Sequence, residues 1–107
     1  MIFIVVKFTA HPEDSYRWMD TVMPLTRGTR AEPGCKWYEW YHSVDEPNVF
    51  VVVEAFEDDA AAQAHMNADH FIAGMAAIKP LLAKTPEIVM QPVDADGWGE
   101  LDAARVD

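Results

Sequence analysis

The sequence predicts one α+β domain in which helices cover a single face of a four-stranded antiparallel sheet. Its 107 residues are the length of one domain, and half of them are hydrophobic, which is enough for a core. Four strand-like runs and two helical regions follow one another in the order β-α-β-β-α-β. That order is typical of the ferredoxin-like split βαβ fold, whose helices lie together on one side of the sheet.

The first strand is predicted at residues 2–8, a nearly continuous apolar run rich in β-branched side chains. A helix should begin near Pro12, because proline suits a first helical turn and two acidic residues follow it at the positive end of the helix dipole. Trp18, Val22, Leu25 and Thr29 follow at helical spacing, and Pro24 within this pattern is expected to kink the helix. Gly34 permits the chain to turn away at its end.

An aromatic hairpin comes next. Strands are predicted at residues 37–41 and 50–56, with a turn at 45–48 between them. On the second of these strands Glu54 shares a face with apolar side chains, since side chains two positions apart point the same way. A carboxylate on such a face should be paired or have a raised pKa.

The second helical region is predicted in two pieces. An Ala-rich helix runs from residue 57 to 65, and the polar residues 67–69 interrupt it before a second apolar helical stripe begins. A last strand is expected at 87–93. Beyond it the chain is acidic and lacks core periodicity, so we expect a domain at residues 1–93 and a separate acidic tail at 94–107.

The predicted strands are apolar or aromatic on both faces, whereas the helices of this fold cover only one. An uncovered apolar face of that size favours packing against a second copy of the chain. The sequence therefore predicts a homodimer.

Charge and cysteine content exclude several classes of partner. The chain has 18 acidic and 8 basic residues, and a net charge of −10 repels nucleic acid and anionic lipid. A single cysteine, Cys35, makes no internal disulfide and is expected to be a small buried residue rather than a nucleophile. The N-terminal apolar run is too short to cross a bilayer and no basic residues precede it, so a soluble cytoplasmic protein is expected.

Several short motifs occur in fixed order along the chain. Residues 30–35 read Arg-Ala-Glu-Pro-Gly-Cys, the second hairpin strand ends in Glu-Ala-Phe at 54–56, and Ala64-His65 is followed by Asp-His-Phe at 69–71. Together these motifs resemble those of the antibiotic biosynthesis monooxygenase family. The resemblance extends over roughly residues 1–93.

The resemblance implies a dimeric α+β barrel with a small pocket between the sheet and the helices of each protomer. Many such proteins resemble quinol or anthrone monooxygenases that work without metal or flavin. The expected function is therefore cofactor-independent oxidation of a small phenolic, quinol or polycyclic aromatic substrate by O₂. A non-oxidative isomerase and a small-molecule-binding stress module on the same fold remain the alternatives.

His65 and His70 are the candidate bases for removing a proton from such a substrate, because imidazole titrates near neutral pH. The alternatives are that His65 only ends the first short helix and that His70 only packs in the first turn of the next. Together with Asp69 they would also form a metal-ligand set, but no metal is expected here.

Glu54 is the third candidate catalytic residue, able to orient a histidine or to act as a base. The alternative for it is an ion pair with Lys7, Arg27 or Arg30. Aromatic, soft and amide side chains of the hairpin and the second helical region are the expected substrate contacts. They are Trp37, Tyr38, Trp40, Asn67, Phe71 and Met75.

Overall fold

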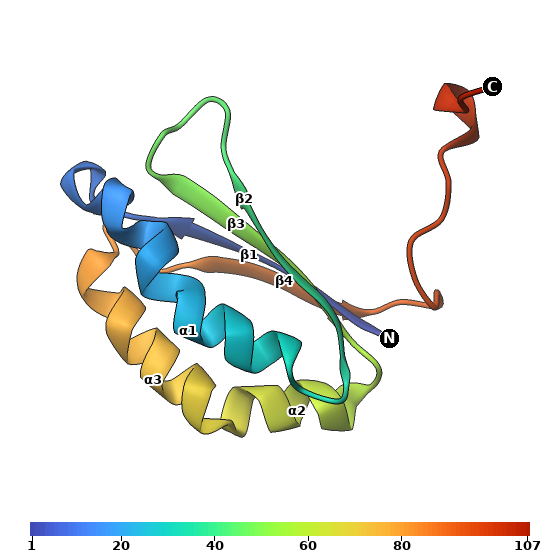
Figure 1. Ribbon diagram of the computed structural model, residues 1–107, viewed down its shortest axis with the longest axis horizontal. Coiled ribbons are helices and arrows are strands. Elements are labelled where there is room, and N and C mark those ends of the chain that lie inside the picture. The colour runs from blue at the N-terminus through green and yellow to red at the C-terminus, as the bar shows by residue number, and fades with distance from the viewer.

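Four antiparallel strands form one sheet in the order β2-β3-β1-β4, and three α-helices lie on one face of it (Figure 1). The computed structural model describes all residues, 1–107. The elements are β1 (Ile2–Thr9), the 3-10 helix η1 (Pro12–Arg17), α1 (Trp18–Arg30), β2 (Cys35–His42), β3 (Val49–Phe56), α2 (Asp59–Asn67), α3 (Asp69–Ile78), η2 (Lys79–Leu81), β4 (Glu87–Pro92) and η3 (Asp102–Ala104). The predicted ferredoxin-like α+β fold is confirmed.

The four strands and the break in the second helical region lie where the sequence predicts them. The first helical region differs at its start, because Pro12 opens a 3-10 segment and the α-helix begins only at Trp18. In that segment Asp14 N donates to His11 O at 2.9 Å, a bond spanning three residues as in the tight turns common at helix ends. The α-helix then continues through Pro24, an exposed position.

The main core lies between α1 and the centre of the sheet. Trp18 is completely buried there and stacks on Phe50, with ring centroids 5.1 Å apart. Trp40 packs against Phe8 and donates its indole N–H to Thr26 Oγ1 at 2.9 Å. These aromatic contacts fix the end of the sheet that lies under the start of α1.

The break between α2 and α3 is a single extended residue. Asp58 caps α2 by accepting from the backbone N–H of Ala61 at 2.8 Å. Ala68 has ψ of 147°, so it ends α2 and also starts α3. This sharp turn places the last turn of α2 and the first turn of α3 beside the loop that follows α1 (Figure 1).

The other face of the sheet carries no helix (Figure 1). Strand alternation and register place Phe3, Val5, Trp37 and Val53 on it, and Phe3 and Trp37 meet edge to face with centroids 6.5 Å apart. After β4 the chain first contacts β2, where Lys36 donates to Asp96 O at 2.9 Å and Trp98 packs against Trp37 with ring centroids 5.2 Å apart. The C-terminal end then extends away from the sheet (Figure 1). No helix in the structure is both long and apolar enough to cross a membrane.

Candidate active site

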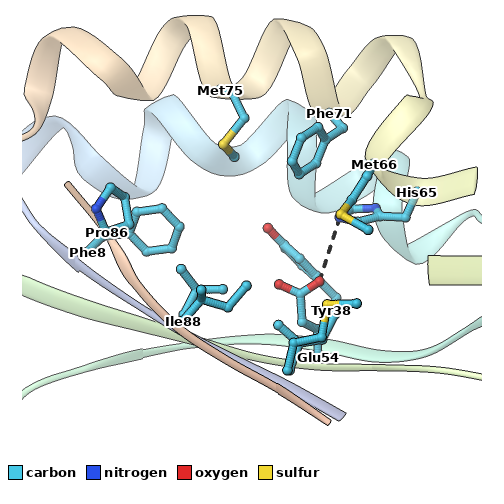
Figure 2. Close-up of a pocket in the computed structure, with 12 residues that line it drawn as sticks. Phe8, Tyr38, Glu54, His65, Met66, Phe71, Met75, Pro86 and Ile88 are labelled. Atoms are coloured by element: carbon cyan, nitrogen blue, oxygen red, sulfur yellow. Dashed lines mark ion pairs between the residues drawn. The ribbon is translucent and has the colours of Figure 1, made fainter. Parts of the chain in front are cut away.

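A cavity of about 200 Å³ lies between the sheet and the helices α2 and α3 (Figure 2). Nine of the twelve residues that line it are hydrophobic, so its walls offer a ligand few hydrogen-bonding groups. The lining residues are Ile4, Val6, Phe8, Tyr38, Glu54, His65, Met66, Phe71, Met75, Pro86, Ile88 and Met90.

Three polar side chains meet in this cavity: Tyr38 from β2, Glu54 from β3 and His65 from α2. They are 2%, 5% and 3% exposed, so all three are withdrawn from water. Figure 2 shows the Tyr38 hydroxyl and the Glu54 carboxyl pointing from the sheet toward the helices. The arrangement brings a base and two hydrogen-bonding oxygens into one apolar space.

Burial decides the protonation state of the Glu54 carboxyl and the Tyr38 hydroxyl. Removal from water raises the pKa of Glu54 to about 8, and the negative charge of Glu32 adds to the effect. Burial, followed by the charge of Glu54, raises the pKa of the Tyr38 hydroxyl far above its ordinary value. At neutral pH both groups are therefore mainly protonated, and each can donate a hydrogen bond to a ligand oxygen.

His65 lies between two carboxyl groups. Its Nδ1 is 2.9 Å from Glu32 Oε2, and its Nε2 is 3.6 Å from Glu54 Oε1, beyond direct hydrogen-bond distance. Since a carboxylate only accepts, Nδ1 carries the proton and donates to Glu32. That tautomer leaves the lone pair of Nε2 free, beside Glu54 and the cavity.

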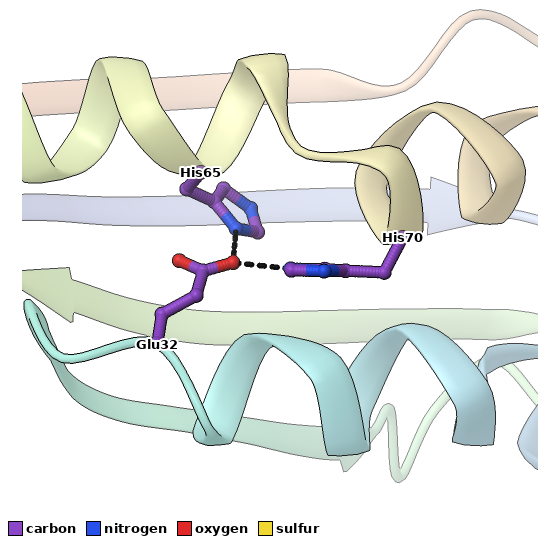
Figure 3. Close-up of side chains that lie close together, drawn as sticks. All are labelled: Glu32, His65 and His70. Atoms are coloured by element: carbon purple, nitrogen blue, oxygen red, sulfur yellow. Dashed lines mark hydrogen bonds and ion pairs between the residues drawn. The ribbon is translucent and has the colours of Figure 1, made fainter.

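Glu32 also joins His65 to His70 (Figure 3). The same Oε2 atom is in very short contact with His70 Nε2. The side chains become more exposed outward along this line, from 4% for His65 to 14% for Glu32 and 30% for His70. The network therefore runs from the buried imidazole of His65 toward the surface.

Aromatic rings hold the His65 imidazole from several sides. Phe56 lies 4.8 Å from it and Phe71 5.0 Å, measured between ring centroids, and Tyr38 lies 6.1 Å away. A ring fixed by packing on its faces and by a carboxylate at Nδ1 has little freedom to turn. This is the pre-organisation that a general base requires.

Glu32, His65 and His70 are also a set with metal-ligand composition, and one donor atom from each lies within 4.8 Å of the others. One carboxylate oxygen already contacts both imidazoles directly, so a hydrogen-bond network accounts for the arrangement. Asp69, which the sequence offers as a third ligand, is exposed and lies outside this set.

Five of the nine predicted site residues line the cavity: Tyr38, Glu54, His65, Phe71 and Met75. His70 does not line the cavity and contacts Glu32 on its more exposed side instead. Trp37 points to the helix-free face of the sheet, because it is one position from Tyr38 and strand side chains alternate. Trp40 packs in the core beside Trp18, and Asn67 is exposed and donates to Gln63 O at 3.0 Å.

Glu32 is the site residue that the sequence analysis missed, although it lies within the Arg-Ala-Glu-Pro-Gly-Cys motif. The signal was an acidic residue at the end of a long helix, directly before a Pro-Gly turn. The alternative of an ion pair between Glu54 and Lys7, Arg27 or Arg30 is wrong, because the basic side chain within 4 Å of its carboxyl is that of His65. Arg30 instead donates to the backbone oxygen of Tyr38 at 2.9 Å.

Cys35 begins β2 close to this network and is half-buried. Burial, together with the nearby charge of Glu32, raises the pKa of its thiol to about 11. The thiol is therefore protonated at neutral pH, which agrees with a packing role rather than a nucleophilic one.

The chain is similar in sequence to known proteins. The family model described as "Antibiotic biosynthesis monooxygenase" matches residues 1–77. A Bacillus subtilis (strain 168) protein described as "Putative monooxygenase YcnE" is 30% identical over 89 residues, which cover 83% of this chain and 94% of that protein.

Solved structures agree on the fold. A "putative antibiotic biosynthesis monooxygenase" from Caulobacter crescentus CB15 superposes with a TM-score of 0.81 at 28% identity, over 90% of each chain. One from Nitrosomonas europaea has a TM-score of 0.83 at 19% identity and covers 89% of this chain and 100% of its own.

Proposed function

Because the chain belongs to the antibiotic biosynthesis monooxygenase family, we propose that it is a cofactor-independent monooxygenase acting on a small phenolic, quinol or polycyclic aromatic substrate. The observation that supports this most is the buried imidazole of His65, held by Glu32 at Nδ1, with Nε2 free at an apolar cavity. A substrate of this class is electron-rich, so it supplies the electrons that reduce dioxygen.

The first step is removal of a proton from a substrate hydroxyl or activated C–H by Nε2 of His65. The imidazolium that forms is stabilised by the Glu32 carboxylate, 2.9 Å from Nδ1. In the same way, the histidine of a hydrolytic triad acts as the base while a carboxylate orients it and stabilises its charged form. His70 supports it by donating a second hydrogen bond to Glu32.

Tyr38 and Glu54 bind the oxygen of the ionised substrate by donating hydrogen bonds to it. Both are protonated at neutral pH and both lie in the cavity, so they can donate to the developing oxyanion. Phe71 and Met75 form part of the apolar wall that contacts the ring and excludes water from the reactive intermediate.

The substrate anion then transfers one electron to O₂, and the resulting radical and superoxide combine at carbon. His65 returns its proton to the peroxide and removes the remaining hydrogen from that carbon as a proton. The O–O bond breaks, one oxygen stays as a carbonyl, and the other leaves as water with the two hydrogens. The product has gained one oxygen atom and lost two hydrogens, and no other oxidant or reductant is consumed.

A non-oxidative isomerase is the second candidate. The observation that favours it is the 3.6 Å separation of His65 Nε2 and the protonated Glu54 carboxyl. A base and an acid so close can move a proton between two carbons of an enolisable carbonyl compound. This reaction would consume no oxygen.

The helix-free face of the sheet supports assembly as a homodimer. Phe3, Val5, Val51 and Val53 lie on it and are only half-buried in one chain. A second copy packed on this face would remove that apolar area from water. We keep residues 1–93 as the dimerising domain and 94–107 as a separate tail.

Oxygen consumption by chelator-treated protein tests the proposed function. Hydroquinones, naphthalenediols and anthrones are each offered and corrected for their own autoxidation. We expect uptake that His65→Asn abolishes and that His42→Asn leaves unchanged, since His42 is exposed and bonds to Pro47 O. Absence of uptake across the panel from folded protein would reject the oxygenase, and isomerisation of an enolisable ketone would then support the second candidate.

A further inference from the structure

A second apolar groove adjoins the cavity at the end opposite to His65. Its volume is about 420 Å³, and six of its eight lining residues are hydrophobic. It runs along α3, where Ile72 and Ala76 line it, and extends past Lys79 at the start of η2 to Leu82. Of the residues with a role in the proposed reaction, Met75 alone lines it, so the proposed mechanism leaves most of this groove without a role.

The groove and the cavity share part of their walls. Phe8, Met75 and Pro86 line both. Figure 2 shows these three side chains at one end of the cavity and His65 at the other. Met75 is half-buried, and an unbranched thioether changes rotamer at little cost, so the partition between the two spaces is an adaptable one.

The polar groups decide which way a ligand points. His65, Glu54 and Tyr38 are the hydrogen-bonding groups of the cavity, so a hydroxylated ring must place its oxygen beside them. The rest of such a ring then faces Met75 and the groove. A cavity of about 150 Å³ holds one benzene ring, so a space of about 200 Å³ is largely filled by the ring itself.

We propose that the substrate carries an uncharged hydrocarbon chain, which leaves the ring opposite its reactive hydroxyl and passes Met75 into the groove beside Ala76. This inference rests on the proposed function, because it takes the ring to be held at His65. A hydrocarbon fits because the groove offers almost no hydrogen-bonding group along its walls, and Lys79 is its one charged residue.

Binding of alkylphenols tests the inference without any oxidation. Phenol, para-propylphenol and para-hexylphenol are titrated calorimetrically into the full chain. Each methylene that enters the groove should raise affinity about fourfold, the equivalent of the usual transfer free energy of a buried CH₂. Equal affinity for the three phenols would overturn the inference. This is also the result expected if a second copy of the chain filled the groove.

Two substitutions on the same exposed stretch of α3 distinguish binding in the groove from nonspecific hydrophobic binding. Ala76→Phe fills the groove, whereas Ala73→Phe adds the same ring at an exposed position that lines neither space. We expect Ala76→Phe to remove the gain from the alkyl chain and to leave phenol affinity unchanged, and Ala73→Phe to change neither.

A chain-length gain that survives Ala76→Phe would place the chain elsewhere and refute the inference. If no phenol binds to the folded protein, the placement of the ring at His65 fails, and the inference fails with it. If phenol binds without a chain-length gain, only the hydrocarbon chain is refuted.

Discussion

Glu32 Oε2 lies 2.9 Å from His65 Nδ1, so a turn residue holds an imidazole 33 positions later in the chain. The pair joins the loop after α1 to the last turn of α2, two elements that share no backbone hydrogen bond across this contact. It fixes which nitrogen of His65 carries the proton, and hence which one is free as a base.

Replacing Glu32 with Gln should lower turnover by about 100-fold or more, because the imidazolium loses its countercharge and the tautomer is no longer fixed. The rate of oxygen uptake on the best substrate of the panel measures this. Glu39→Gln is the matched control, since Glu39 pairs with Arg30 on the exposed part of β2. Equal rates for wild type and Glu32→Gln would remove Glu32 from the mechanism.

Glu54 should make the protein less stable as pH rises. Its pKa is about 8 when folded and near the ordinary 4.5 when unfolded, so between these values the unfolded chain releases a proton that the folded one retains. The free energy of unfolding should therefore fall from about pH 4.5 to about pH 8 and the effect level off above. Urea unfolding of wild type and Glu54→Gln across this range measures the difference.

In Glu54→Gln the stability should exceed that of wild type progressively more toward pH 8, because glutamine does not ionise. Glu39→Gln, an exposed control on the neighbouring strand, should keep the slope of wild type. A constant difference between wild type and Glu54→Gln at every pH would show that the Glu54 carboxyl is not protonated in the folded state.

The same carboxyl predicts the alkaline side of the activity profile. If protonated Glu54 donates to the substrate oxyanion, kcat should decline as pH passes about 8, where the group ionises. Glu54→Gln keeps a neutral donor at this position, so its profile should lose that decline while the acidic side, due to the base, remains. A decline of equal midpoint in both proteins would assign it to another group.

Gly28 makes room for His70. A Cβ at Gly28 would lie 2.6 Å from His70 Cγ and 2.9 Å from its Cβ, so alanine there must push apart α1 and the start of α3. We expect Gly28→Ala to cost about 1–3 kcal/mol of unfolding free energy, as overpacked sites do. Gly97→Ala is the control, since nothing lies within 4 Å of that position, and equal loss in both would contradict the contact.

The open face of the sheet predicts the assembly. Val53→Glu places a charge at its centre and should convert the dimer to a monomer in sedimentation-velocity experiments, because an unpaired carboxylate would be buried between copies. Val44→Glu, in a turn where Val44 is 98% exposed, should leave the dimer intact. A wild-type monomer at micromolar concentration would refute the assembly itself.

Much of this molecule could be predicted from local sequence. The period-2 pattern of β3 placed Glu54 on one face with Phe50, Val52 and Phe56. The structure shows that the helices cover this face, and its burial accounts for the raised pKa of Glu54. The polar break at residues 67–69 predicted two helices in place of one, and Ala68 is where the chain turns. The 3-10 start at Pro12 departs from the expected elements, because Pro12 suits the first turn of either helix type. The two short 3-10 helices η2 and η3 were not expected either, and α2 begins two residues later than predicted, at Asp59.

The sequence by itself determined the order of strands and helices, the two-sided apolar sheet and the presence of two histidines around a helix break, because these depend on periodicity and on breakers within a few residues. Only the tertiary structure decided the partners. It turned Trp37 away from the cavity and brought Glu32 to His65, with His70 on the outer side of Glu32. Such contacts depend on how α1 and the two short helices pack across the sheet, and no local pattern encodes the distance between residues so far apart in the chain.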